Sequence, residues 1–357
     1  MEQQKSMEMG KQQKQQQPEE EESSHYNRGG VNNLPPLRCI VKLGGAAITY
    51  KHEIEMINEE NLRTVSSQLR QAMMTESSSA KVSGMDWSKG LGNLEVPTAD
   101  DFEKNPMLNA GNFVIVHGAG SFGHFQASRS GVHKGGLQLP FVKAGFVATR
   151  ISVTSLNLEI VRALAQEGIP SVGMSPFACG WSTWERNIAH ADISQLSKTI
   201  DSGFVPVLHG DAVFDDLQGC TILSGDLIIR HLAQLLRPKY VVFLTDVLGV
   251  YDRPPQDSNA VLLREIAVGE DGSWSIVKPI LETNKVEITV ASHDTTGGMA
   301  TKISEAAMIA KLGIDVYIVK AGTSHSLRAL TGEITRSIPD DWLGTVIRFS
   351  KQTNATD

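Results

Sequence analysis

The sequence predicts an α/β protein: a three-layer αβα sandwich in which helices cover both faces of a mostly parallel central sheet. Two observations lead to this prediction. Short runs rich in β-branched residues alternate along the chain with longer segments in which apolar residues recur with helical spacing. Several of the short runs end directly in glycine, as strands that precede binding loops often do in such sheets.

Predicted strands and helices follow one another from residue 38 to residue 320. The predicted strands are 38–43, 112–117, 204–209, 240–245 and 316–320. Gly168 and Pro170 stop one predicted helix and Pro238 stops another; the helices are 61–73, 139–166, 227–236 and 299–312. Shorter runs between residues 212 and 223 predict a hairpin on the same domain.

The two ends of the chain differ from this pattern. Residues 1–33 contain the runs Gln15–Gln17 and Glu19–Glu22 but almost no apolar residues, which predicts a disordered tail. Residues 34–350 form the predicted folded domain, and 351–357 form a short C-terminal tail. Within the domain, serine, glycine and proline interrupt any period between about residues 75 and 110, which predicts a mobile insertion.

Composition and charge exclude several classes of protein. With 33 basic and 40 acidic residues the net charge is −7, so no basic field indicates a nucleic-acid partner. The apolar runs are far shorter than the roughly 20 residues that span a bilayer, so we expect no membrane segment. The three cysteines are scattered and the tail is acidic, unlike a transit peptide, so we expect a cytoplasmic protein.

Four glycine-containing segments lie where anions bind in α/β sheets, after strands or at the starts of helices. They are Lys42 to Ala47 with Lys51 close behind, 117–124 (His-Gly-Ala-Gly-Ser-Phe-Gly-His), Ser224-Gly225-Asp226, and 294–302 with Lys302 at its end. A tight turn or a capped helix explains each one alone about as well as a ligand does. Their combination, with lysines at three of the sites, favours a polyphosphate ligand and phosphoryl transfer, which depends on positioning and charge.

The second segment has two other interpretations. Its glycines satisfy G-x-G-x-x-G, but no acidic residue lies between His124 and Leu158 to hold a ribose, so a dinucleotide site is not supported. The stretch from Ala119 to Gly123 also approximates the nucleophile elbow G-x-S-x-G. In that alternative Ser121 is the nucleophile of a hydrolase, with Asp246 and His293 or His325 behind it. We rank it lower because it leaves the lysines unexplained.

In these segments the chain resembles the amino acid kinase superfamily and, within it, the isopentenyl phosphate kinases. The resemblance spans about residues 38–348 and includes 245–252, Thr-Asp-Val-Leu-Gly-Val-Tyr-Asp. Its sharpest marker is Ser121-Phe122-Gly123-His124, because in isopentenyl phosphate kinases this histidine contacts the acceptor phosphate. Ala119 departs from the family, which more often has glycine there.

The resemblance implies the amino acid kinase fold and a role for each motif residue. Lys42 and Lys302 would bind the phosphates of ATP, and Asp226 would orient both lysines. Lys51 would stabilise the transition state. Further contacts to ATP would come from Gly44, Gly45, Ala46, Gly120, Asp246, Tyr251 and Gly298. The acceptor phosphate would lie against Ala119, His124 and Gly210.

The implied reaction is in-line attack by an oxygen of isopentenyl phosphate on the γ-phosphorus of ATP, giving isopentenyl diphosphate and ADP for isoprenoid biosynthesis. A phosphate dianion needs no general base. Mg²⁺ is expected on the nucleotide oxygens without a protein ligand. The family also implies a homodimer. Another small phosphate, phosphonate or carboxylate is the alternative acceptor within the same superfamily.

The isoprenoid tail needs an apolar slot, which we expect along the helix that follows the His124 segment. Candidates for its lining are Phe141, Phe146, Val147, Ile151 and Val153, although packing in the core explains most of them as well.

Overall fold

The computed structural model describes residues 37–74, 84–86, 98–100, 112–279, 298–335 and 337–350. The predicted tails at 1–33 and 351–357 and most of the predicted insertion lie outside these residues. Among the helices of the described ranges, none combines the length and apolar character needed to cross a bilayer.

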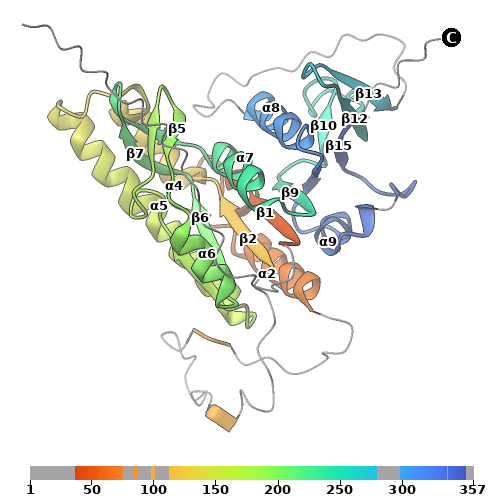
Figure 1. Cartoon of the computed structure of the whole chain (residues 1–357), viewed down its shortest axis with the longest axis horizontal. Helices are drawn as coiled ribbons and strands as arrows, with labels where there is room; N and C mark the ends of the chain where they lie inside the picture. The colour runs from red at the N-terminus through yellow and green to blue at the C-terminus, as the bar shows by residue number, and fades with distance from the viewer. Residues whose placement is uncertain are drawn as a thin grey trace, which may run out of the picture. The chain divides into compact units, whose positions relative to one another are not determined.

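A nine-stranded sheet organises the described residues (Figure 1), in the order β13-β12-β15-β14-β9-β1-β2-β6-β3. Five adjacent inner strands, from β14 to β6, run parallel and end at the residues predicted from the sequence. They are β1 (Cys39–Leu43), β2 (Phe113–His117), β6 (Val205–His209), β9 (Tyr240–Thr245) and β14 (Asp315–Lys320).

The outer strands of the sheet were not predicted. On one side β3 (Ser171–Met174) pairs parallel to β6. On the other side β15 (Thr345–Phe349) pairs antiparallel to β14, followed by β12 (Glu265–Val268) and β13 (Trp274–Lys278). These strands are short or alternate in burial, so their periodicity is weaker than that of the central strands.

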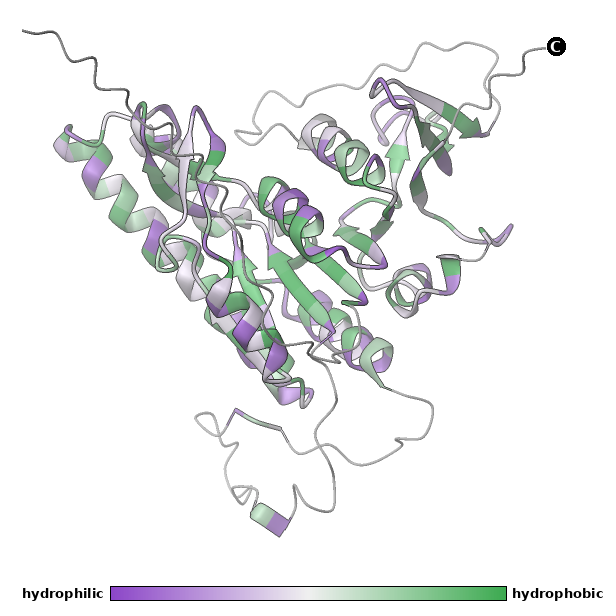
Figure 2. Ribbon diagram, in the orientation of Figure 1, coloured by the Kyte–Doolittle hydropathy of each residue, from purple (hydrophilic) through white to green (hydrophobic). Residues whose placement is uncertain are grey.

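Helices cover both faces of the sheet, which confirms the three-layer prediction. One core contains residues of α2 (Glu59–Met73), α5 (Pro140–Gln166) and α9 (Ser324–Thr331). The other contains residues of α6 (Ser194–Asp201), α7 (Gly225–Leu236) and α8 (Gly298–Ala310). Because side chains alternate along a strand, Val41 of β1 joins the first core and Ile40 the second. Figure 2 shows hydrophobic residues along the central strands.

A second, four-stranded sheet has the order β5-β4-β7-β8. The predicted hairpin is its antiparallel pair β7 (Asp211–Asp215) and β8 (Gly219–Leu223), joined by β4 (Ser182–Trp184) and β5 (Asn187–His190). Two further strands, β10 (Val250–Tyr251) and β11 (Leu262–Leu263), pair with each other. Short helical turns are α1 (Gly45–Ile48), η1 (Val132–Lys134) and η2 (Glu333–Thr335).

The helix α4 (Gly120–Ser130) follows β2 and packs along α5. Two glycines allow this close approach. A Cβ at Gly145 would lie 2.0 Å from Cβ of Ser130, and a Cβ at Gly123 would lie 2.6 Å from Cγ1 of Val153. The α4–α5 contact therefore sets the position of the loop that precedes α4.

Gly145→Ala tests this contact. Alanine is normally the better helix former by about 1 kcal/mol. Here the added methyl overlaps Ser130, so we expect the free energy of unfolding to fall by about 1–3 kcal/mol. The control is Ser128→Ala on the exposed side of α4, the other helix of this contact, which should stay within about 0.5 kcal/mol of the parent. Equal denaturant midpoints for the two variants would contradict the expectation.

Candidate active site

The carboxyl ends of the central strands meet at one edge of the sheet. Leu43 pairs with His117 on one side and with Leu244 on the other, and His117 pairs with His209. In the sheet, β2 and β6 lie on one side of β1, and β9 and β14, which come later in the chain, lie on its other side. Such a reversal of strand order opens the crevice in which open α/β sheets bind ligands.

The first two predicted glycine segments touch through their backbones. A Cβ at Gly45 would lie 2.4 Å from both N and Cα of Gly120, and Gly120 has a φ of +53°, which favours glycine. The amide of Gly118 also donates to the carbonyl of Leu43 at 2.9 Å. Glycine is therefore required at these positions by the fold of the two loops, before any ligand binds.

Thr49 joins the same two loops and was not assigned a role from the sequence. Its hydroxyl donates to the carbonyl of Gly45 at 2.9 Å and accepts from the amide of Ser121 at 3.1 Å. A threonine four residues after the last glycine of the loop was the available signal, but only the structure shows what the hydroxyl contacts.

The start of α1 supplies main-chain amides to this edge. The amide of Gly44 donates a hydrogen bond to the carbonyl of Leu244 at 2.8 Å, so it is not available to a ligand. Gly45 and Ala46 occupy the first positions of α1, and Gly120 that of α4, where N–H groups have no partner within the helix. In the first loop the amides suited to an anion are therefore those of Gly45 and Ala46.

The structure brings together Lys42, Asp226 and Lys302, as predicted. Nζ of Lys42 lies 2.5 Å from Oδ1 of Asp226, and Nζ of Lys302 lies 3.9 Å from Oδ2. All three side chains are buried or nearly so. Burial raises the pKa of the Asp226 carboxyl, but the two lysines outweigh it and the pKa lies below its ordinary value.

The third segment positions that carboxylate. The hydroxyl of Ser224 accepts from the amide of Leu227 and caps α7, so Asp226 stands in the first turn of the helix. One carboxylate between two ammonium groups leaves an excess positive charge at the edge of the sheet. That charge and the helix N-termini favour an anionic ligand.

Lys51 lies on an exposed loop beside Asp246. Its Nζ is 3.3 Å from Oδ2 of Asp246, with 65% of the lysine side chain exposed. Glu55, in the same loop, accepts hydrogen bonds from Ser152 of α5 and Gln126 of α4 at 2.6 Å and 3.0 Å. The loop that carries Lys51 is thereby held against the helices that follow the second glycine segment.

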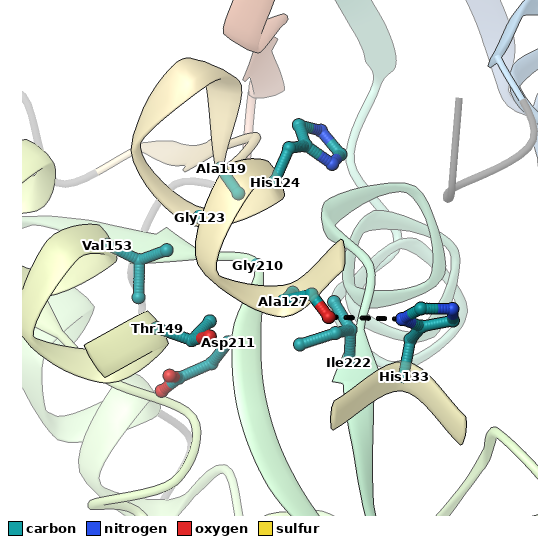
Figure 3. A pocket seen from close by; sticks show the side chains of 10 residues that line it. All are labelled: Ala119, Gly123, His124, Ala127, His133, Thr149, Val153, Gly210, Asp211 and Ile222. Carbon is teal, nitrogen blue, oxygen red and sulfur yellow. Dashed lines mark hydrogen bonds between the residues drawn. The ribbon is translucent and has the colours of Figure 1, made fainter. Parts of the chain in front are cut away.

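A small pocket lies beside the second loop, between α4 and α5 (Figure 3). The three residues expected at the acceptor phosphate, Ala119, His124 and Gly210, all line it. Most of the rest of its lining is apolar or small, with Thr149, Asp211 and His133 as the further polar residues; the remaining members are Gly123, Ala127, Val153 and Ile222.

The candidates for an isoprenoid slot on α5 are only partly correct. Val153 lines the pocket. Phe146 is buried, but it packs against Phe177 and Phe214. The prediction was wrong for Phe141, Val147 and Ile151, which are 63%, 54% and 64% exposed because they point to the outer side of α5.

The remaining predicted residues are those that the sequence analysis expected at the nucleotide. Asp246 directly follows β9, Tyr251 belongs to β10, and Gly298 begins α8. Partial burial raises the pKa of Tyr251 above its ordinary value. Residues 294–297 of the fourth segment lie outside the described residues, so only its helical end, with Lys302, is placed.

The hydrolase alternative is not favoured. Ser121 is buried, and within the described ranges its hydroxyl has no hydrogen-bond partner, so His325 does not contact it. The other candidate base, His293, lies outside the described residues. A nucleophile elbow presents its serine to the substrate.

Comparison with known proteins agrees with this geometry. A model described as the amino acid kinase family matches residues 98–320. The chain belongs to the amino acid kinase family. An isopentenyl phosphate kinase of Arabidopsis thaliana is 70% identical over 320 residues, covering 88% of this chain and 96% of the relative.

More distant relatives are also named isopentenyl phosphate kinase. An isopentenyl phosphate kinase of Methanothermobacter thermautotrophicus is 32% identical over 307 residues, covering 83% of this chain and 96% of its own. A solved isopentenyl phosphate kinase structure aligns with a TM-score of 0.60 at 30% identity, covering 83% and 96% of the two chains. A product complex of the Thermoplasma acidophilum enzyme aligns with the same TM-score at 26% identity, covering 87% and 100%.

Asp226→Asn tests the buried charge cluster. The amide keeps the shape of the carboxylate but removes the negative charge between two ammonium groups, so we expect the free energy of unfolding to fall by about 3–5 kcal/mol at pH 7. Because the folded pKa is depressed below 3.8, the contribution of Asp226 is complete above pH 3.8 and is lost as the pH falls through the folded pKa.

Urea denaturation of parent and variant between pH 7 and pH 3 measures this difference. The gap between them should stay constant down to about pH 4 and narrow below it. Asp246→Asn, at the exposed pair with Lys51, is the control and should cost at most about 1 kcal/mol. A gap that is already absent at pH 7 would contradict the role of Asp226.

Proposed function

We propose that this protein transfers the γ-phosphoryl group of ATP to isopentenyl phosphate and so forms isopentenyl diphosphate and ADP. The observation that carries the proposal is the pocket beside the lysine cluster. One part of its lining is His124 with the small residues Ala119 and Gly210 (Figure 3). The other part is mainly apolar or small but includes the polar residues Thr149, Asp211 and His133. A small hydrocarbon that ends in a phosphate matches both parts. The names of the relatives support the same acceptor.

The proposed roles follow from the geometry. Lys42 and Lys302 neutralise the ATP phosphates and the transferring group. Asp226 positions the two ammonium groups, one at each of its carboxylate oxygens. The helix N-termini at Gly45 and Gly120 donate main-chain N–H groups to phosphate oxygens. Asp246, Tyr251 and Gly298 lie on the nucleotide side.

On the acceptor side, His124 donates a hydrogen bond to the phosphate, and a nearby dianion favours its charged form. Lys51, on its exposed loop, approaches the equatorial oxygens of the transferring group in the transition state. The acceptor oxygen then attacks phosphorus in line with the leaving ADP, and no base removes a proton.

In the proposed reaction Mg²⁺ binds together with ATP. Among the residues that the structure describes, no three or more histidine, cysteine, aspartate or glutamate side chains gather as a metal site. Asp226 is occupied by lysines. Phosphate oxygens and water are therefore the ligands we propose, and the ion supplies positive charge to the β- and γ-phosphates.

We also propose that the protein is a cytoplasmic homodimer. The outer side of α5 exposes residues spaced three and four apart, the pattern of a helix that packs on another: Ala144, Val147, Ile151, Thr154 and Leu158. Next to it β3 is an edge strand of the described sheet. A second copy of this chain could cover both at once. The three cysteines are free thiols, which fits a reducing compartment.

A coupled assay for ADP with isopentenyl phosphate tests the reaction. Parent protein with ATP and Mg²⁺ should turn over, and EDTA should stop it. His124→Ala should reduce kcat/KM for isopentenyl phosphate at least about 100-fold, the size expected when a charge-assisted contact is lost. The KM for ATP should change little. His190→Ala, on an exposed strand, is the control and should retain full activity. Undiminished turnover by His124→Ala would rule out its proposed contact.

Ile151→Asp tests the proposed dimer. A charge at the centre of the apolar side of α5 should shift the sedimentation coefficient from dimer to monomer, because an unpaired carboxylate cannot be buried there without a large cost. Lys143→Asp, also on the exposed part of α5, is the control and should remain dimeric. A parent protein that sediments as a monomer at micromolar concentration would contradict the proposal.

A further inference from the structure

A buried polar chain lies directly behind the acceptor pocket and has no role in the reaction described above. It contains His117, the last residue of β2, and Asn157 of α5, with exposed fractions of 0% and 6%. Buried polar side chains are costly unless they are hydrogen-bonded, so their partners indicate what they hold in place.

The hydrogen bonds of Asn157 define which ring nitrogen of His117 carries the proton. Nδ2 of Asn157 lies 3.0 Å from the carbonyl oxygen of Val207 and 3.1 Å from Nε2 of His117. A carbonyl oxygen only accepts, so the Asn157 atom facing it is the amide nitrogen, which donates to Nε2 as well. Nε2 is then unprotonated and the ring proton is on Nδ1.

The protonated Nδ1 of His117 donates to the carbonyl of Gly118 at 2.9 Å. Burial, followed by the nearby His209 and Lys42, lowers the pKa of His117 to about 3, so the ring stays neutral beside bound phosphates. The ring of His209 stacks on that of His117 with 5.6 Å between centroids and packs against one face of the imidazole.

The Gly118 carbonyl and the Ala119 N–H belong to one trans peptide group and point in opposite directions. While the carbonyl is held toward His117, the Ala119 N–H points away from the ring. A Cβ at Gly210 would lie 3.9 Å from N of Ala119 and 3.4 Å from N of Gly225. The space that Gly210 leaves open is thus bordered by two amide nitrogens, each at the start of a helix, and by the carbonyl oxygen of Leu223 at 3.4 Å.

We propose that Asn157 and His117 are positioning residues for the acceptor phosphate. Asn157 sets the tautomer of His117, and the protonated Nδ1 of His117 then donates a hydrogen bond to the carbonyl of Gly118. This bond fixes the orientation of the peptide group, so that the Ala119 N–H points at a phosphate oxygen next to Gly210. This inference rests on the proposed function, because it assumes that the acceptor phosphate lies at this edge. It adds two residues that never touch the substrate.

His117→Asn and His117→Gln form a matched pair of variants. The amide nitrogen of asparagine falls near the position of Nδ1 and can donate to Gly118, whereas that of glutamine reaches the position of Nε2 and cannot. Both remove the ring and its stacking on His209, so both should lower the melting temperature alike.

The kinetic result separates the two variants. We expect the KM for isopentenyl phosphate of His117→Gln to exceed that of His117→Asn at least about tenfold, the size of one misdirected hydrogen bond to a charged group. The KM for ATP should be alike in both. If the two variants lose acceptor affinity equally, in step with their melting temperatures, His117 is only structural and the proposal is wrong.

The tautomer can be measured without turnover. In ¹⁵N NMR spectra of the ring nitrogens, the signals lost in His117→Asn identify His117, and they should show Nδ1 protonated and Nε2 bare. Asn157→Asp, which has the same shape but cannot donate, should move the proton to Nε2. A parent ring protonated at Nε2 would overturn the inference. Absent turnover in the parent protein would instead refute the proposed function.

Discussion

The contact between the backbones of Gly45 and Gly120 is the constraint on which the rest of the site depends. It brings the loop after β1 within contact distance of the loop after β2, and any side chain at Gly45 would overlap the partner backbone. Thr49 then bonds both loops with one hydroxyl. Because these atoms pack before a ligand arrives, the amides at the starts of α1 and α4 face one edge without rearrangement, which reduces the entropic cost of binding.

Charge is the second feature that defines the site. Lys42 and Lys302 both approach Asp226, and without it their two positive charges would repel each other. The carboxylate at the start of α7 makes their approach possible. The carboxylate is in turn placed by a cap at Ser224. Main-chain geometry and side-chain charge thus converge on the same edge of the sheet, where two phosphorylated molecules need to meet.

Predictions from the sequence were accurate where a residue's role follows from its neighbours in the chain. The five central strands ended at the predicted residues because apolar runs followed by glycine mark both the strand and its end. The lysine cluster was anticipated through motif resemblance. The outer strands β3, β12, β13 and β15 were missed, since short strands of mixed burial show little periodicity. Residues on the exposed side of α5 were expected to line a pocket or pack in the core, because periodicity shows that a helix has an apolar side but not what covers it.

The sequence alone determined the class of fold, the ends of the five predicted strands and the identity of the groups that we propose for phosphate binding, because these depend on local pattern and residue chemistry. Only the tertiary structure decided which distant residues meet. The pairing of Asp226 with two lysines, the bridge made by Thr49 and the chain from Asn157 through His117 to Gly118 join segments tens to hundreds of residues apart. Such contacts are set by the order of strands in the sheet and by burial, and neither leaves a local signal in the chain.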